Sequence, residues 1–344
     1  MQKTVSLQEI YAPIERHLEA VPPAILEILS SPNELAHDVT RYFFSALGKL
    51  LRPALTFLGA GIKGDSLEIS ARLVKLGSAF EIFHAATLIH DDIIDSAYLR
   101  RNIPTVNVKW GPEVAVLVGD YLHNHAIEAI FQNGNEKIFS LFLQTAGRVC
   151  DGEIHELKEK DNYGLTEAEY FEIIDKKTAV LLACNAAAGA MLAGSSPEEA
   201  EALKRYGHAF GKAFQIVDDC LDFTGEQHEF GKTLGADCAA GVLTLPLIRL
   251  TQLVDEKKKS ETVKIFSALE LGGCAGNFGG KSEMSTSKFQ TLLSMIREYG
   301  TIEYSMERAR EFCDQARLEL SVFKQSPARR SLELLLDYVL ERGR

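Results

Sequence analysis

Apolar residues recur with the period of an α-helix along almost the whole chain, and this pattern constrains the fold more than any other feature. Between Leu73 and Leu88 they return every three or four positions, which places them on one helix face. No convincing run of alternating apolar and polar residues predicts a strand. The pattern therefore predicts a single all-α domain over residues 1–344, with further helices over 111–133, 136–160, 166–194, 197–223, 287–322 and 328–342.

Capping residues mark several predicted helix starts. Ser70 precedes one helix, Thr166 is followed three residues later by Glu169, and Ser196 precedes a proline and two glutamates. One segment breaks the composition, because "LGGCAGNFGGKSEMSTS" at 271–287 is rich in glycine and serine. This composition predicts a mobile loop.

Composition and charge exclude several classes of protein. A formal net charge of −11 argues against general nucleic-acid binding, which needs a basic surface. The six cysteines occur singly, which favours a reducing cytoplasm over a disulfide framework or a zinc site. No apolar signal sequence stands at the N-terminus, and the apolar stretch 179–194 is too short for a membrane span and contains Asn185. We therefore expect a cytoplasmic protein without a transmembrane segment, in which 179–194 is a buried helix.

The stretch "IHDDIID" gathers three carboxylates at the end of an apolar helix. Asp91 and Asp95 are one helical turn apart, and Asp92 lies three residues from Asp95. Crowded carboxylates repel one another unless a cation lies between them, and hard oxygen ligands suit Mg²⁺. A solvated acidic helix end is the alternative for one such motif. However, "IVDDCLD" repeats the spacing with Asp218, Asp219 and Asp222, also at the end of an apolar helix.

Two acidic triplets predict a cluster of Mg²⁺ ions around an oxygen-rich anion, for which a diphosphate is the natural candidate. Basic residues support this interpretation, since guanidinium groups bind phosphate through two hydrogen bonds. Singly each basic residue would be interpreted as a solvated surface charge. Lys49 and Arg52, three residues apart, are predicted to share a helix face. The other candidates are Arg100, Arg101, Lys176, Lys177 and Lys232.

The segment "GEQHEFGKT" at 225–233 looks like a phosphate-binding P-loop. Five residues separate Gly225 from Gly231, whereas the motif needs four, and no strand precedes it. We therefore reject the P-loop interpretation.

In order and spacing, these motifs resemble the trans-isoprenyl diphosphate synthases (polyprenyl synthetases). The segments that carry the resemblance are "GKLLRP", "HAATLIHDDIIDSAYLRRNIPTV", "LVGDYL", "KKTAVLLACNAAAGA", "FQIVDDCLDFTG", "GKTLGAD" and "TLPL". The resemblance implies an all-α fold around a deep central cavity and usually a homodimer. It also implies Mg²⁺-dependent head-to-tail condensation of isopentenyl diphosphate with an allylic diphosphate.

The resemblance also assigns roles to individual residues. Metal would be held by the six aspartates Asp91, Asp92, Asp95, Asp218, Asp219 and Asp222. Isopentenyl diphosphate would be bound by Lys49, Arg52, His84 and Arg101. The allylic diphosphate would contact Arg100, Lys177, Thr178, Gln215 and Lys232, with Lys177, Thr178 and Gln215 also near the developing carbocation as the catalytic set.

Three positions depart from the family pattern. Asn102 replaces a glycine after the two arginines, and because asparagine tolerates positive φ we expect the turn to survive. Ala236 replaces a frequent lysine. Val242 replaces a lysine that normally reaches the allylic diphosphate, which puts tight allylic binding in doubt.

Product length depends on the side chains below the first acidic motif. Ala86 and Thr87 are small, and in the family small residues here let the growing chain descend, so a long-chain product is predicted. A floor at Phe83 or on 136–157 would instead stop elongation at geranylgeranyl length, and farnesyl diphosphate synthase is a further alternative. Two other classes stay open: a non-catalytic subunit of a heteromeric synthase, and a terpene cyclase.

Overall fold

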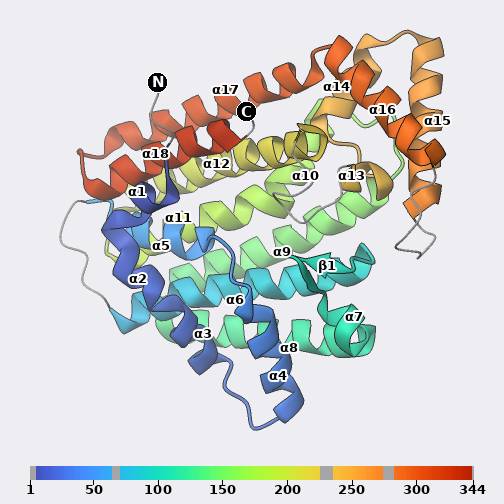
Figure 1. Cartoon of the computed structure of the whole chain (residues 1–344). Helices are drawn as coiled ribbons and strands as arrows, with labels where there is room; N and C mark the ends of the chain where they lie inside the picture. The colour runs from blue at the N-terminus through green and yellow to red at the C-terminus, as the bar shows by residue number, and fades with distance from the viewer. Residues whose placement is uncertain (1–4, 64–69, 225–234, 274–282, 343–344) are drawn as a thin grey trace. The chain divides into compact units, whose positions relative to one another are not determined.

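Helices make up nearly all the regular structure of the chain in the computed structural model, which describes residues 5–63, 70–224, 235–273 and 283–342 (Figure 1). The chain divides into two units. The first comprises Met1–Ala146, Leu181–His208 and Ala316–Tyr338. The second comprises Gly147–Val180, Ala209–Gln315 and Val339–Arg344. The predicted all-α fold is confirmed.

The first unit is built mainly from the N-terminal helices. These are α1 (Leu7–Tyr11), α2 (Glu15–Glu19), α3 (Val21–Ile28), α4 (Glu34–Ser45), α5 (Leu51–Ala60), α6 (Ala71–Ile94), α7 (Val106–Trp110) and α8 (Pro112–Asn133), with a 3-10 turn at Ala12–Ile14. Most of α11 (Val180–Leu192) and a 3-10 turn at Leu320–Val322 also belong to it.

The second unit contains α10 (Glu167–Ile174), a π-helical turn at Asp175–Ala179, α13 (Ala236–Ala239), α14 (Leu245–Leu253), α15 (Glu256–Gly273) and α16 (Glu283–Glu298). Within it, α16 packs against α14 and α15, and α13 contacts α15. Four helices run through both units: α9 (Glu136–Glu159), α12 (Pro197–Thr224), α17 (Thr301–Glu319) and α18 (Pro327–Arg342).

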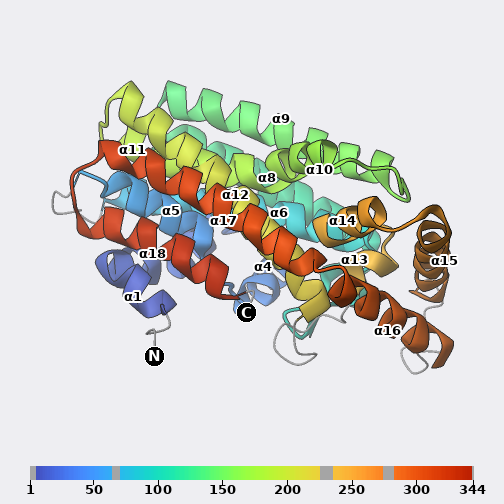
Figure 2. The same ribbon diagram turned by 90° about the horizontal axis from the view of Figure 1, so that it is seen from above.

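Helix α6 forms the centre of the first unit and ends at the first acidic motif. It packs against α3, α5 and α8, and Figures 1 and 2 show α8 beside it. The side chains of Leu76, Phe80 and Ile89 on α6 are fully buried. Burying such side chains stabilises the fold by roughly 1.5–3 kcal/mol each. The predicted start is confirmed, because the side chain of Ser70 accepts a hydrogen bond from the amide of Leu73.

A two-residue antiparallel hairpin follows α6, which the sequence did not predict. Strand β1 (Leu99–Arg100) pairs with β2 (Ile103–Pro104). The two residues between the strands, Arg101 and Asn102, have φ of 52° and 65°. Such paired positive φ values match the twist of a tight hairpin turn. The expectation that Asn102 preserves this turn is confirmed.

Other predicted helix starts and the buried helix are also confirmed. Thr166 and Glu169 form a reciprocal capping box at the start of α10, and Ser196 accepts a hydrogen bond from the amide of Glu199 at the start of α12. Helix α11 is buried, with Leu182 and Ala186 fully enclosed. None of the helices described is both long and apolar enough to cross a membrane.

Two boundaries differ from the predictions. The helix predicted over 287–322 is two helices, α16 and α17, because Gly300 adopts a φ of 61° that a right-handed helix cannot continue through. The loop predicted over 271–287 is too long at both ends, since α15 continues to Gly273 and α16 begins at Glu283. Helical hydrogen bonds override the local glycine and serine composition there. The remainder, 274–282, lies outside the described residues.

Candidate functional site

The first acidic motif ends α6, and its three carboxylates have different surroundings. Asp92 is buried, Asp91 is half-buried, and Asp95 is exposed at the C-cap, where its amide bonds the carbonyl of Asp91. Arg100 donates from Nε and Nη2 to the Asp92 carboxylate at 2.7–2.9 Å. Asp92 therefore binds the hairpin to α6, whereas Asp91 and Asp95 lie nearer to solvent.

Lys49 and Arg52 do not share a helix face, contrary to the prediction. Helix α5 begins only at Leu51, and Leu50 before it has a left-handed φ of 51°. Pro53 explains this start, because proline lacks an amide hydrogen and is tolerated only in the first turn of a helix. Lys49 thus belongs to the preceding loop, and Arg52 to the first turn of α5.

A buried carboxylate, Glu81, lies among the residues predicted to bind isopentenyl diphosphate. It is 5% exposed and interacts electrostatically with Arg52 and Arg101. Burial raises the pKa of Glu81, an effect that both guanidinium groups oppose. Burial also lowers the pKa of Arg52 to about 10, with Glu81 acting in the opposite direction. Among the described residues, neither Nε of Arg52 nor Oε2 of Glu81 has a hydrogen-bond partner.

His84 follows Glu81 by about one helical turn in the same cluster. Burial lowers its pKa well below the ordinary value, and the charges of Arg52, Arg100 and Arg101 lower it further. The imidazole is therefore neutral near pH 7. A neutral ring in this place can donate a hydrogen bond to a phosphate without adding charge.

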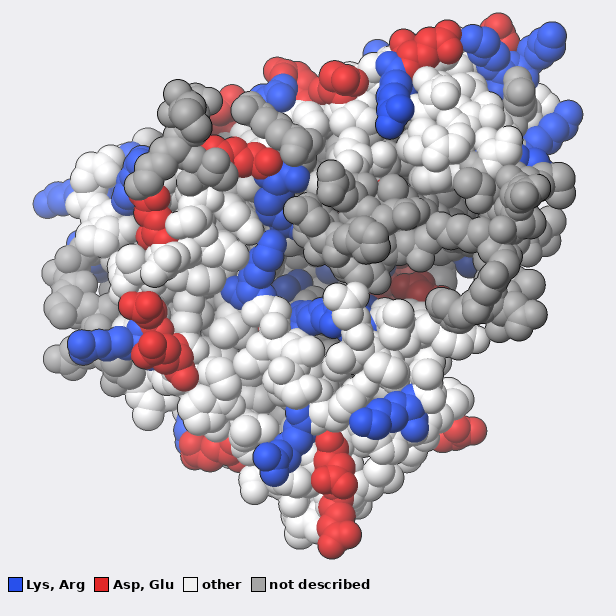
Figure 3. Space-filling view, in the orientation of Figure 1, with Lys and Arg blue, Asp and Glu red and all other residues white. Residues whose placement is uncertain are grey.

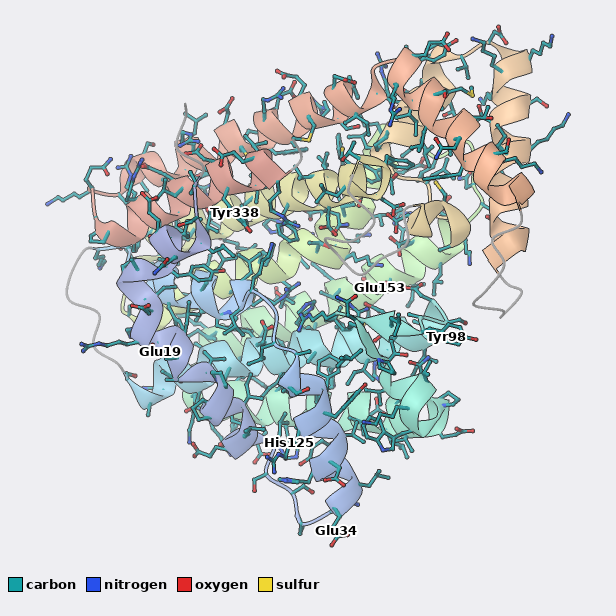
Figure 4. All side chains as sticks on the ribbon, in the orientation of Figure 1. Glu19, Glu34, Tyr98, His125, Glu153 and Tyr338 are labelled. Carbon is teal, nitrogen blue, oxygen red and sulfur yellow. The ribbon has the colours of Figure 1, made fainter. Side chains whose placement is uncertain are left out.

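Two tyrosines from distant parts of the first unit hold Lys49. The hydroxyl of Tyr11 donates to the Lys49 carbonyl at 2.8 Å, and Nζ of Lys49 donates to the hydroxyl of Tyr338 at 3.0 Å. Tyr338 comes from α18 and is labelled in Figure 4. Burial raises the pKa of Tyr11 well above its ordinary value, so its hydroxyl stays protonated.

A small pocket, partly open to solvent, lies beside the hairpin in the first unit. Its walls include Tyr42 from α4, the buried Asp92, and Arg100 and Arg101 from the hairpin. Arg101 also donates a hydrogen bond to the carbonyl of Ala46. The predicted basic residues of this unit, Lys49 apart, thus gather around α5, α6 and the hairpin.

In the second unit, a π-helical turn between α10 and α11 places Lys177 and Thr178. Such turns are rare and occur often at functional sites. Gly152 of α9 lets the turn approach closely, because a Cβ atom there would lie 2.7 Å from the Lys177 amide nitrogen. Nζ of Lys177 lies 3.0 Å from Glu153 and 2.6 Å from Glu156, both on α9. Figure 4 labels Glu153.

Lys176 has a different environment. Its Nζ donates to Glu172 at 2.6 Å, an exposed pair one helical turn apart. Of the two adjacent lysines, Lys177 is therefore the one that contacts α9.

The second acidic motif is linked to Thr178 by a chain of hydrogen bonds. Thr178 donates to Oε1 of Gln215 at 2.8 Å, and Nε2 of Gln215 donates to Oδ1 of Asp219 at 2.8 Å. The hydroxyl of Tyr170 donates to Oδ2 of Asp219 at 2.6 Å. Burial raises the pKa of Asp219, as does the charge of Asp237, while these two hydrogen bonds oppose the shift.

The outer aspartates of this motif have different partners. Asp222 accepts from the amides of Gly235 at 3.1 Å and Asp237 at 3.2 Å, and so binds the N-terminal end of α13. Oδ1 of Asp218 lies 3.2 Å from Nη2 of Arg342, in the last turn of α18.

The remaining predicted positions are placed as follows. Lys232, Gly225 and Gly231 lie outside the described residues. Ala236 begins α13, and Val242 is half-buried with its amide bonded to the Asp237 carbonyl. Ala86 is 1% exposed, Thr87 donates to the His84 carbonyl, and Phe83 packs edge-on against Phe142 at 5.0 Å.

Several residues at these positions were missed from the sequence. They are Tyr11, Glu81, Glu153, Glu156, Tyr170, Tyr338 and Arg342. Only the spacing of Glu153 and Glu156, three residues apart on one helix, carried a usable signal. The others reach their partners through tertiary contacts.

Comparison with known proteins decides the family. The model of the polyprenyl synthetase family matches residues 33–270. The chain belongs to the polyprenyl synthetase family. It is a prenyltransferase of the trans-isoprenyl diphosphate synthase type, as the sequence motifs predicted.

Individual relatives in this family differ in the product that their names state. The chain is 32% identical to a short chain isoprenyl diphosphate synthase of Methanothermobacter thermautotrophicus, over 98% of this chain and 99% of that protein. It is 30% identical to the octaprenyl diphosphate synthase of Escherichia coli K12, over 99% and 100%. A solved polyprenyl synthase of Caulobacter crescentus CB15, complexed with calcium and isoprenyl diphosphate, is 29% identical with a TM-score of 0.89, over 100% and 99%.

Figure 3 shows acidic and basic side chains interspersed on the face in view.

Proposed function

We propose that this polyprenyl synthetase condenses isopentenyl diphosphate head to tail with an allylic diphosphate, in a Mg²⁺-dependent reaction. The observation that carries the proposal is the cluster of Arg52, Arg101 and the neutral His84 around Glu81, in the same unit as the first acidic motif. Two guanidinium groups and a neutral donor match the charge and oxygen atoms of a diphosphate. Lys49, held by two tyrosines, adds a third cation.

The acidic residues fit Mg²⁺. They supply hard oxygen donors, and Mg²⁺ usually takes one or two protein carboxylates together with water and phosphate oxygens. Asp92 and Asp219 are buried, and both oxygens of Asp222 accept hydrogen bonds from backbone amides. The more exposed Asp91, Asp95 and Asp218 are therefore the first candidates for direct coordination. Among the described residues, no three acidic, His or Cys side chains converge as a metal site. This favours coordination completed by the substrate diphosphate.

The reaction begins when the allylic carbon–oxygen bond breaks. Mg²⁺, when bound, offsets the negative charge of the departing diphosphate. Lys177, Thr178 and Gln215 lie at the π-helical turn and along α12, where Gln215 and the Thr178 hydroxyl present dipoles to the allylic cation. The alkene of isopentenyl diphosphate, held by Lys49, Arg52, His84 and Arg101, attacks this cation. The released diphosphate takes the proton lost in forming the new double bond.

The product is proposed to be a long-chain trans-polyprenyl diphosphate, of hexaprenyl length or above. Small side chains at Ala86 and Thr87, below Asp91 on α6, support this length. The aromatic pair Phe83 and Phe142 is the alternative floor of the product site, which would stop elongation at geranylgeranyl diphosphate. Product analysis by mass spectrometry distinguishes the two.

The enzyme is proposed to act as a homodimer. On α9, Gly147, Cys150 and Ile154 are exposed and lie along one helical stripe, and Ile154 is 65% exposed. An apolar stripe with a glycine suits a helix of a second copy. Ile154→Asp should then yield a monomer in light scattering, whereas an unchanged mass would show that this stripe is not the interface.

The function is tested with purified protein, isopentenyl diphosphate, geranyl or farnesyl diphosphate, and Mg²⁺. We expect consumption of isopentenyl diphosphate that excess chelator abolishes. Asp91→Ala and Asp218→Ala should each lower turnover by at least ~100-fold, about 2.7 kcal/mol of transition-state stabilisation. Asp38→Ala, at an exposed position of α4, is the matched control.

The alternatives give different results. A non-catalytic subunit would leave both substrates unchanged, and a terpene cyclase would consume the allylic diphosphate without isopentenyl diphosphate. Normal turnover in either aspartate variant would contradict the proposed metal site.

A further inference from the structure

The last turn of the C-terminal helix reaches the second acidic motif. Nη2 of Arg342 lies 3.2 Å from Oδ1 of Asp218, across 124 residues of sequence. The guanidinium carbon also lies 5.1 Å from the ring centroid of Phe214, one helical turn before Asp218 on α12. The side chain of Arg342 is therefore held by two residues of one face of α12.

The burial of Arg342 separates this contact from an ordinary surface ion pair. Its side chain is only 11% exposed, and its Nε is enclosed without a hydrogen-bond partner among the described residues. Enclosing a cation with an unsatisfied donor costs free energy, on the order of 1–3 kcal/mol for the donor alone. Exposed pairs contribute about 0–1 kcal/mol, too little to offset this cost. The burial of Arg342 despite this free-energy cost indicates that its guanidinium group has a specific role.

Asp218 also differs from its two neighbours in the motif. Asp219 uses both oxygens for Tyr170 and Gln215, and Asp222 uses both for backbone amides. Among the described residues, Asp218 bonds only through Oδ1, to Arg342. Its Oδ2 is thus the carboxylate oxygen of this motif that no described residue occupies.

Carboxylates that bind metals are commonly held by an outer hydrogen bond that fixes their orientation. We propose that Arg342 is such a positioning residue, which holds Oδ1 of Asp218 so that Oδ2 faces the metal. This inference rests on the proposed function, in which Asp218 coordinates Mg²⁺. It makes the end of α18 part of the active site, although Arg342 itself does not touch the reacting atoms.

The test measures metal binding as well as turnover. Mn²⁺ is titrated into the full-length protein with inorganic pyrophosphate present, and free Mn²⁺ is followed by electron paramagnetic resonance. Arg342→Ala should raise the Mn²⁺ dissociation constant about 10- to 100-fold, the usual cost of losing an outer partner. The Mg²⁺ concentration for half-maximal turnover should rise in parallel, while the KM for isopentenyl diphosphate stays within twofold. Arg342→Lys keeps the charge but loses the planar donor, so its effect should be intermediate.

The matched control is Arg317→Ala. Arg317 pairs with Asp337 at 2.7 Å between α17 and α18, within the first unit. This variant should leave Mn²⁺ binding unchanged. Unfolding temperatures show whether either variant is merely destabilised, and Arg342→Lys provides the answer if Arg342→Ala does not fold.

Two results would overturn the inference. Unchanged Mn²⁺ affinity in a folded Arg342→Ala variant would show that Arg342 does not position the ligand. Tighter binding would show that the guanidinium competes with the metal. Failure of the proposed function is distinct, because the wild-type protein would then not consume isopentenyl diphosphate.

Discussion

The hydroxyl of Tyr170 donates a 2.6 Å hydrogen bond to Oδ2 of Asp219, across 49 residues of sequence. Both groups are buried, and Gln215 satisfies the other carboxylate oxygen. Asp219 is therefore fixed within the second unit by two protein donors. Its place in a D-D-x-x-D motif predicts a metal ligand, and its contacts also order the end of α12.

Tyr170→Phe should weaken the fixing of the Asp219 carboxylate at the end of α12. The ring remains, but Oδ2 of Asp219 loses its donor, which costs about 1–3 kcal/mol of unfolding free energy. We also expect a higher KM for the allylic diphosphate, because Gln215 and Thr178 depend on the same hydrogen-bond chain. Urea unfolding and steady-state kinetics measure the two effects. Tyr304→Phe, which removes a less buried bond to Glu167, is the control.

A Tyr170→Phe variant as stable and active as Tyr304→Phe would show that the bond contributes nothing. A loss of stability without any change in KM would restrict Tyr170 to a role in folding.

Glu81→Gln should destabilise the first unit. The buried carboxylate offsets the charges of Arg52 and Arg101, so its neutralisation leaves two guanidinium groups without their counter-charge. Breaking a buried pair typically costs about 3–5 kcal/mol. Inorganic pyrophosphate should restore part of this loss, because a bound diphosphate supplies the missing negative charge. Urea unfolding with and without pyrophosphate measures both quantities.

Glu19→Gln is the control for Glu81→Gln, because Glu19 is exposed on α2 and labelled in Figure 4. A stabilisation by pyrophosphate that is equal in wild type, Glu81→Gln and Glu19→Gln would contradict the assignment of Glu81 as the counter-charge.

His84 should make stability depend on pH. Its pKa in the folded protein is below the unfolded value of about 6.5, because burial and three arginines disfavour the charged ring. Below pH 6.5 the unfolded chain therefore binds a proton that the folded chain does not. Unfolding free energy should fall as pH drops through this range, by up to about 1.4 kcal/mol per pH unit from this group.

The comparison is made between wild type and His84→Gln by urea unfolding at pH 7.5, 6.5 and 5.5. The stability of wild type relative to the variant should decrease below pH 6.5, while above it the difference is constant. His37→Gln, at an exposed position of α4, is the control. A constant difference over the whole range would mean that the ring has the same pKa in the folded and unfolded chain.

The fold was predictable because helical periodicity and capping are local. Ser70, Thr166 and Ser196 mark helix starts by bonding within their own first turns. The break at Gly300 was missed because the apolar period continues across it. Lys49 and Arg52 were misassigned to one face because Pro53 was not used as the mark of a helix start, and the left-handed φ of Leu50 has no sequence signal. The partners of Asp92 and Asp219 show most clearly what the sequence does not predict. Arg100 reaches Asp92, and Tyr170 reaches Asp219, only through the tertiary fold.

The length of the product tests whether the growing prenyl chain runs along α6 below the first acidic motif. Ala86 lies five residues before Asp91 on α6, about 7.5 Å along the helix axis. In the proposed long-chain enzyme, Ala86→Phe should block the growing chain and shorten the main product to farnesyl or geranylgeranyl diphosphate. Consumption of isopentenyl diphosphate should continue, because the diphosphate-binding residues are untouched. Overpacking at this buried position costs about 1–3 kcal/mol, so circular dichroism must show that the variant is folded.

Phe83→Ala distinguishes the alternative floor. Phe83 packs edge-on against Phe142, with Phe80 at 6.1 Å from the same ring. If this aromatic cluster forms the floor, wild type stops at geranylgeranyl diphosphate and Phe83→Ala gives longer products. If the growing prenyl chain passes beside this aromatic cluster, wild type makes hexaprenyl or longer products, and Phe83→Ala changes the product length little. A wild-type enzyme that stops at farnesyl diphosphate would refute both, because neither Ala86 nor Thr87 is large enough to impose that limit.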